Sequence, residues 1–338
     1  MEIIRDTIRD VAQKAGVSPG AVSRILNNDP TLSVSSETRQ KVFDAAKQLH
    51  YHAKTNKDKS NFKMGILLWL SPEQELQDDY YLLTRKGIED FCQKHAISIA
   101  RAFLSDPSSL NNLKDVDGLI CVGKFSPVSI QQFIDICPNI VFLDMPVYHF
   151  NITSLSMDFY QAVETALNHL VKLGHTRIAY LGGCEYLENG EIFHNERKSA
   201  YISYMQNHHL EYEPLIYEGK FSAASGYEMA TRMLQNQVLP TAVFTANDAI
   251  AFGAIKAIKE HNLSVPEDIS IIGFNDSEMC SYITPALTTI HAPAYDMGQH
   301  GANLIYTARS LNISTPLKAK LPCYLVERES CKQKENSK

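Results

Sequence analysis

The chain has 338 residues, of which 44% are hydrophobic, and a formal net charge of −6. That length and apolar content support two or three folded domains and exclude a disordered chain. No run of about 18 uncharged apolar residues occurs, which argues against a membrane span, and the acidic start lacks the basic and apolar stretches of a signal peptide. We therefore expect a cytoplasmic protein.

The seven cysteines are scattered and form no Cys-x-x-Cys pair. Such spacing fits neither a zinc site nor a disulfide framework, so we expect most of them in the core, and we predict no metal and no cofactor. Common enzyme motifs, such as Gly-x-Gly-x-x-Gly and Gly-x-Ser-x-Gly, are missing. The sequence therefore predicts a protein that is not an enzyme.

Charge is distributed unevenly along the chain. Residues 1–60 hold ten Lys and Arg against seven Asp and Glu, a net charge of +3, whereas the remainder has a net charge of −9. A small basic head beside a large acidic body is expected when only the head meets phosphates. The distribution favours double-stranded DNA as a partner of the head.

The basic head carries the signals of short helices. Thr7 caps a first helix with Asp10 at the reciprocal position of a capping box, and Gly16 ends that helix. Ser18 caps a second helix after the tight turn, and a third begins after Ser35. Three short helices in about 50 residues are typical of a helix-turn-helix domain.

Polar side chains on the second helix suit DNA. Ser18, Ser23, Arg24 and Asn27 offer small donors and one guanidinium, which match phosphate oxygens and guanine edges. A helical hairpin without a role in DNA binding is the alternative, because capped short helices are common.

A polar, lysine-rich stretch at 50–62 has too few large apolar residues to form a core of its own. We therefore predict a helix-turn-helix domain at 1–49, a hinge at 50–62 and a large core at 63–332. The predicted lobes of the core are an N-lobe at about 63–157 and 292–318 and a C-lobe at about 158–291 and 319–330.

The core alternates short apolar runs with helical stretches, which predicts an α/β fold. The runs are MGILLWL, ISIARAF, GLICVG, IVFLDM, RIAYLGG, TAVFTAND and ISIIGFND. Runs this apolar are typical of parallel strands that are covered on both faces. Their two series predict two doubly wound lobes.

Polar residues follow several of these runs. Asp144, Asn247 and Asn275 lie at strand ends, where ligands of doubly wound sheets bind, and their forked side chains suit sugar hydroxyls. The alternative is turn chemistry, because Asp and Asn also cap helices. The pattern predicts a ligand cleft between the lobes.

The segment TIRDVAQKAGVSPGAVSRILN at 7–27 closely resembles the signature of the lactose/galactose repressor family. The resemblance continues through LGHTRIA at 173–179, TANDAIAFG at 245–253 and DISIIGFND at 268–276, and covers nearly the whole chain. It implies a periplasmic-binding-protein-like core, a homodimer, and operator binding that a small effector controls.

By position, the resemblance places Pro19, Gly20 and Arg24 where family members contact major-groove bases. Pro19 and Gly20 offer no side-chain hydrogen bond, so Arg24 is the main polar base contact, unless it contacts phosphate alone. The hinge lacks the leucine that family members wedge into the minor groove, which predicts reliance on phosphates and a steep loss of affinity with salt. The predicted DNA-contacting residues are Thr7, Ser18, Pro19, Gly20, Ser23, Arg24 and Asn27.

The resemblance also implies effector contacts. Arg197 matches an effector-binding position, as do the three strand-end residues, and Phe221 matches an aromatic side chain that packs against the effector. Asp79 and Tyr80 resemble the stretch that lines the other lobe, where tyrosine rings either stack on a pyranose or belong to the core. The predicted effector-binding residues are Asp79, Tyr80, Asp144, Arg197, Phe221, Asn247 and Asn275.

Within the family, the chain looks most like the galactose and galactoside regulators. This resemblance predicts a transcriptional repressor of sugar-utilisation genes that a small sugar controls. The alternative is a cytoplasmic sugar-binding protein or sugar-handling enzyme without a role in DNA binding. That alternative leaves the basic head and its capped helices without a purpose.

Overall fold

The computed structural model describes residues 7–26, 32–49, 51, 62–75, 79–311 and 313–334. The chain divides into two compact units, Met1–Asn61 and Phe62–Lys338. The predicted hinge lies outside the described residues except for Tyr51 and Phe62, and so does Asn27.

The first unit contains the predicted helices α1 (Ile8–Ala15), α2 (Pro19–Leu26) and α3 (Ser36–Gln48). The carboxylate of Asp10 accepts hydrogen bonds from the backbone N–H and the hydroxyl of Thr7, both at 2.6 Å. Gly16 ends α1 with φ of 67°, a left-handed conformation that favours glycine. The hydroxyls of Ser18 and Ser35 accept backbone N–H groups of α2 and α3 at 3.2 and 3.1 Å. The expected capping residues are confirmed.

The three helices share one small apolar core. Each helix contributes fully buried side chains, because its apolar residues recur at helical spacing on one face. The buried residues are Val11, Ala12, Val22, Ile25, Val42, Ala45 and Ala46.

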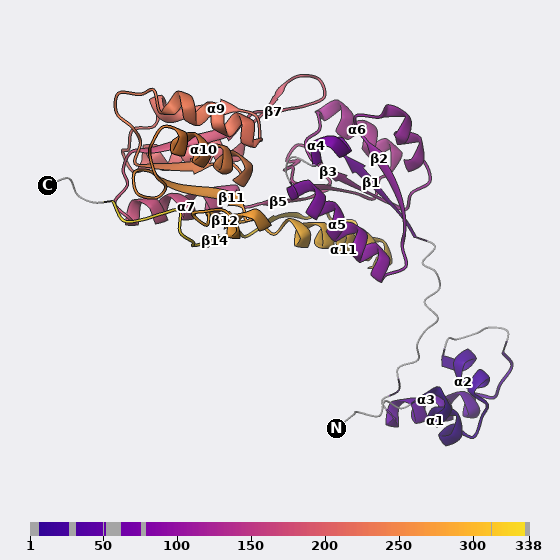
Figure 1. Ribbon diagram of the computed structural model, residues 1–338. Coiled ribbons are helices and arrows are strands. Elements are labelled where there is room, and N and C mark those ends of the chain that lie inside the picture. Colours follow the sequence, from indigo (N-terminus) through magenta and orange to yellow (C-terminus); the bar gives the residue numbers. More distant parts are fainter. Residues whose placement is uncertain are drawn as a thin grey trace. The chain divides into compact units, whose positions relative to one another are not determined.

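The second unit begins with a lobe built on a parallel sheet in the order β13-β5-β4-β3-β1-β2 (Figure 1). Its strands are β1 (Lys63–Leu68), β2 (Ser98–Phe103), β3 (Gly118–Val122), β4 (Ile140–Leu143), β5 (Thr153–Met157) and β13 (Lys318–Leu321). Its helices are α4 (Pro72–Glu75), α5 (Asp79–Lys94), η1 (Pro107–Leu113), α6 (Pro127–Ile136) and α11 (Ala294–Leu311).

Alternate side chains of this sheet pack against different helices. In β1, Ile66 and Leu68 belong to the core cluster that includes residues of α5 and α11. Leu67 belongs to the opposite cluster, together with Ile130 and Phe133 of α6. The sheet is therefore covered on both faces, which explains the continuous apolar runs in the sequence.

The other lobe has a sheet in the order β14-β12-β11-β10-β6-β9, parallel except for the pairing of β12 with β14. Its strands are β6 (Ile178–Gly183), β9 (Ile216–Gly219), β10 (Ala242–Thr245), β11 (Ser270–Asn275), β12 (Thr288–His291) and β14 (Tyr324–Val326), beside a hairpin of β7 (Glu185–Tyr186) and β8 (Ile192–Phe193). Its helices are α7 (Phe159–Lys172), α8 (Glu196–Asn207), η2 (Glu213–Leu215), α9 (Ala223–Met233), α10 (Asp248–Glu260) and η3 (Glu278–Ser281). The predicted pair of doubly wound lobes is confirmed.

One predicted lobe boundary is wrong. Residues 319–321 were assigned to the C-lobe, but they lie in β13, which pairs with β5 in the sheet of the first lobe. The chain therefore makes its last crossing between the lobes after Leu321. The error arises because β13 is an edge strand, whose partly exposed side chains leave no apolar run in the sequence.

Candidate functional site

The outer surface of α2 holds the residues predicted to contact DNA. The core takes up one face of this helix through Val22 and Ile25, which leaves Pro19, Gly20 and Arg24 exposed. Ser18 and Thr7 are also exposed, and Ser23 is half-buried. All predicted DNA-contacting residues that the structure describes are therefore at least partly exposed on the surface of the head. Two of them, Thr7 and Ser18, also cap helices.

The surroundings of Gly20 are open. A Cβ atom built on Gly20 would have the Ser18 hydroxyl, at 4.0 Å, as its nearest neighbour. Gly20 therefore satisfies no packing constraint inside the head. Its lack of a side chain allows the helix backbone to approach another molecule closely.

A cavity of about 630 Å³ lies between the two lobes of the core. Its walls come from the carboxyl ends of strands in both sheets, the position expected for ligands of doubly wound folds. The predicted effector-binding residues that line it are Tyr80, Asp144, Arg197, Phe221 and Asn275.

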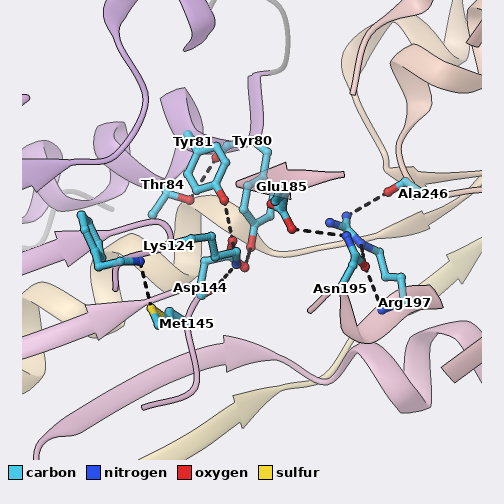
Figure 2. A network of polar contacts seen from close by, with 11 residues as sticks. Tyr80, Tyr81, Thr84, Lys124, Asp144, Met145, Glu185, Asn195, Arg197 and Ala246 are labelled. Atoms are coloured by element: carbon cyan, nitrogen blue, oxygen red, sulfur yellow. Dashed lines mark hydrogen bonds and ion pairs between the residues drawn. The ribbon is translucent and has the colours of Figure 1, made fainter. Parts of the chain in front are cut away.

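Asp144 is the centre of a buried polar cluster on the first lobe. Its carboxylate accepts hydrogen bonds from the hydroxyls of Tyr80 at 2.9 Å and Tyr81 at 2.7 Å, and it forms an ion pair with Lys124 at 2.6 Å (Figure 2). Burial raises the pKa of both tyrosines, and the charge of Asp144 raises it further. The tyrosines therefore stay protonated as donors, and the pair with Lys124 leaves this wall without net charge.

Lys124 escaped the sequence-based prediction. It directly follows β3 and Gly123, and only 3% of its surface is exposed. The strand-end rule that singled out Asp144 applies equally to the run GLICVG and would have found Lys124. Trp69, the only tryptophan of the chain, follows β1 in the same way and also lines the cavity.

Arg197 lies on the second lobe, at the start of α8. Its Nη1 donates to the Ala246 carbonyl at 2.9 Å and its Nε to Asn195 at 3.3 Å. Burial opposes the charge of Arg197, but nearby carboxylates, with Glu185 the foremost, raise its pKa above the usual value. The guanidinium is therefore a permanent cation, and it offers further N–H donors at the cavity wall.

Aromatic rings surround this guanidinium. Its central carbon lies 4.9 Å from the ring centre of Phe159, 5.0 Å from that of Phe221 and 5.4 Å from that of Phe274. Cation–π attraction to these rings holds the guanidinium at the cavity wall. Glu185, which sequence reasoning missed, accepts a hydrogen bond from Asn195 at 3.3 Å beside it.

Two of the strand-end residues have a left-handed backbone. Asp144 has φ of 64° and Asn275 has φ of 112°. Residues with a side chain rarely adopt positive φ, although Asp and Asn tolerate it best. Backbone strain of this kind concentrates at ligand-binding positions, and here both residues line the cavity.

Asp79 and Asn247 are not among the described residues that line the cavity. Asp79 is the first residue of α5, where a negative charge favours the helix terminus. Asn247 is the N-cap of α10 and accepts the Ile250 N–H at 2.9 Å, with 1% of its surface exposed. For Asn247, the geometry matches the turn-chemistry alternative.

The part of the chain that the structure describes shows neither a metal site nor a membrane-spanning helix. Its residues include no group of three or more His, Cys, Asp or Glu that could hold a metal ion. Among them, no helix is long and apolar enough to cross a membrane. Five cysteines are buried and two are half-buried, all without a disulfide, as expected for core residues.

A helix that exposes Arg24 on a three-helix head and a polar cleft in a two-lobed core together define a DNA-binding regulator with an effector domain. Residues 7–54 match the model of bacterial regulatory proteins of the lacI family. Residues 167–331 match the periplasmic binding protein-like domain.

Curated relatives match almost the whole chain. The HTH-type transcriptional repressor MelR of Bacillus subtilis is 32% identical over 96% of this chain and 97% of its own length. The HTH-type transcriptional regulator GalR of Streptococcus thermophilus is 33% identical over 96% and 99%. A solved lac repressor dimer, bound to operator and the anti-inducer ONPF, superposes with a TM-score of 0.71 at 28% identity, over 97% of this chain and 99% of that one.

This chain therefore belongs to the LacI family of bacterial regulatory proteins. It is a DNA-binding transcriptional repressor with a periplasmic-binding-protein-like effector domain, as the sequence predicted. The alternative of a sugar-binding protein without a role in DNA binding is not favoured, because the family match includes the helix-turn-helix head.

Proposed function

We propose that this protein is a cytoplasmic, homodimeric repressor of sugar-utilisation genes, and that galactose or a galactoside in the cleft controls its affinity for operator DNA. In this proposal residues 1–49 bind DNA, residues 63–332 bind the effector and form the dimer, and the protein has no enzymatic role. The relatives named GalR and the lac repressor dimer on its operator support the assignment.

The observation that carries the sugar proposal is the balance of charge in the cleft. Asp144 is paired with Lys124, and Glu185 lies beside Arg197. Each of these two clusters already pairs a positive with a negative group, so neither offers an uncompensated charge to a charged ligand. Neutral hydroxyl groups can form hydrogen bonds to both clusters. Trp69 and Phe221 add aromatic surface that suits the apolar face of a pyranose.

On the head, we propose that α2 enters the major groove. Arg24 would read a guanine edge, Pro19 and Gly20 would fit against the groove, and Ser18 and Ser23 would contact phosphates. A dimer places two such helices about one duplex turn apart on a near-palindrome. The exposure of this face of α2 supports the proposal.

Two measurements test the proposed function. A thermal-shift panel of galactose, lactose, other sugars and purines should show stabilisation by galactose or lactose, because a ligand of the native state raises stability by mass action. A mobility-shift titration against the DNA upstream of the chain's own gene should show a complex whose affinity changes with that sugar. Absence of any shift at low salt would overturn the DNA-binding role.

A further inference from the structure

The β7–β8 hairpin extends from the second lobe toward the first lobe (Figure 1). It leaves the sheet after β6, turns near Gly190 and returns to α8. Glu185, Tyr186 and Glu188 on its outgoing arm line the cavity. The hairpin is therefore a wall of the ligand site, although its base belongs to one lobe only.

The carboxylate of Glu188 reaches across to the first lobe. It accepts the backbone N–H of Ser126 at 3.1 and 3.2 Å, the Ser126 hydroxyl at 2.5 Å, and the Ser129 hydroxyl. Ser126 is the N-cap of α6, so the carboxylate lies at the positive end of that helix. Hydrogen bonds to an ionised acceptor are the strong kind.

Phe193 makes a second contact between the hairpin and the first lobe. Its ring packs against the first-lobe core cluster that contains Phe125 and Phe133. The Nζ of Lys124 lies 5.1 Å from the centre of the same ring. Lys124 is the partner of Asp144, so the hairpin touches the polar cluster that would bind the effector.

We propose that the β7–β8 hairpin is a latch between the lobes, and that Glu188 is the positioning residue that keeps it closed over bound effector. The inference rests on the proposed function of the cleft. The hydrogen-bond donors that Glu188 contacts belong to the opposite lobe. The latch therefore sets how long the loaded, closed core persists, which in turn sets the effector affinity.

The charge of Glu188 is available at neutral pH. Burial acts to raise the pKa of this carboxyl, but the hydroxyls of Ser126 and Ser129 and the Ser126 N–H together hold it below its usual range. The ionised form is thus the bonded form, and Glu188→Gln removes the charge while it keeps the shape of the side chain.

Stopped-flow fluorescence of Trp69 with galactose and lactose measures the latch, because this single tryptophan lines the cavity. Glu188→Gln should raise the rate of sugar dissociation about tenfold and leave the association rate within about twofold, since loss of one charge-assisted contact acts on the closed state. Glu191→Gln removes the same charge from the returning arm of the same hairpin, and both glutamates are exposed, so this control should behave like wild type. An unchanged dissociation rate in Glu188→Gln would overturn the proposal.

Hydrogen exchange of the sugar-free protein separates this inference from the proposed function. Glu188→Gln should speed exchange of the Ser126 amide about tenfold, because that N–H loses its charged acceptor. An unchanged exchange rate of the Ser126 amide would refute the proposed latch, whichever sugar the protein binds. Faster exchange in a protein that binds none of the sugars would support the latch and refute the sugar assignment.

Discussion

The head and the cleft hold their candidate functional side chains in opposite ways. On α2, Gly20 and Arg24 are exposed, and the core of the head forms from the other face of the helix. In the cleft, the Asp144 carboxylate is buried, paired with Lys124 and bonded to two tyrosines. Substitutions in the head should therefore change binding and leave the fold intact, whereas those in the cleft should change both.

The largest expected effect comes from Lys124→Met. The substitution leaves Asp144 as a buried carboxylate without its cation, and removal of one partner of a buried pair costs about 3 kcal/mol of unfolding free energy. Urea unfolding followed by Trp69 fluorescence measures it. The double variant Lys124→Met, Asp144→Asn should recover much of the loss, because it also removes the orphaned charge. A single variant within about 0.5 kcal/mol of wild type would refute the account of the pair.

Arg197→Lys should weaken effector binding about 100-fold, which corresponds to about 2.7 kcal/mol. Lysine keeps the charge but loses the planar fork that bonds to Ala246 and stacks among three phenylalanine rings. Titration calorimetry with the sugar that stabilises the protein in the thermal-shift panel measures this loss of affinity. Arg177→Lys, at a residue whose guanidinium pairs with Glu211, is the matched control in the same lobe. Equal affinity in both variants would show that the fork is not used.

Arg24→Ala should cost about 1–3 kcal/mol of specific operator binding at matched salt, the worth of a bidentate guanine contact. The thermal unfolding of the head should not change, because Arg24 is exposed. Fluorescence anisotropy with operator and with random duplex measures the specificity directly. If the variant discriminates between them as well as wild type does, Arg24 contacts phosphate alone.

Gly20→Ala should stabilise the head by about 0.5–1 kcal/mol, because alanine loses less backbone entropy in a helix and the added methyl meets open space. Calorimetric unfolding measures the gain. Anisotropy then shows whether the methyl reduces operator affinity, as a close approach of α2 to the groove requires. A destabilised head would contradict the open surroundings of Gly20.

The smallest expected effect is the contribution of His175 to the loss of stability at acidic pH. Burial lowers the pKa of His175, whose ring nitrogens bond to the Thr241 hydroxyl and the Lys332 carbonyl. Below about pH 6.5, His175 is protonated in the unfolded chain but not in the folded core. The contribution of His175 to the free energy of unfolding is therefore complete above that pH and falls as the pH drops. Urea unfolding at several pH values should give a weaker acid dependence for His175→Gln. An identical dependence would exclude His175 as its source.

Local signals predicted the head well, because its structure depends on neighbours in sequence. Thr7, Gly16 and Ser18 act within a few residues of their own positions. In the core, the strand-end rule found Asp144 and Asn275 at the cavity. The same rule also singled out Asn247, which caps the next helix, so the rule alone does not distinguish a capping asparagine from one that contacts a ligand.

The features that the sequence did not predict depend on contacts between distant residues, which local sequence patterns do not indicate. Glu188 bonds to a serine 62 positions earlier, and nothing in the intervening sequence indicates that pairing. Strand β5 was missed because Ser154 and Ser156 are buried in it, so it shows no apolar run. Such elements acquire their roles only when the sheet and the lobes are assembled.

If the cleft controls the head, effector binding must change operator affinity, and one anisotropy experiment measures this change. Operator affinity is measured in wild type and in Arg197→Lys, without sugar and with sugar at about ten times the wild-type Kd, which fills the wild-type cleft but leaves a cleft of 100-fold weaker affinity mostly empty. We expect the sugar to change the operator affinity of wild type by about tenfold or more, within the usual range of allosteric coupling, and to leave that of Arg197→Lys nearly unchanged at the same concentration. An operator affinity that stays constant in wild type while the cleft is saturated would contradict control of the head by the cleft.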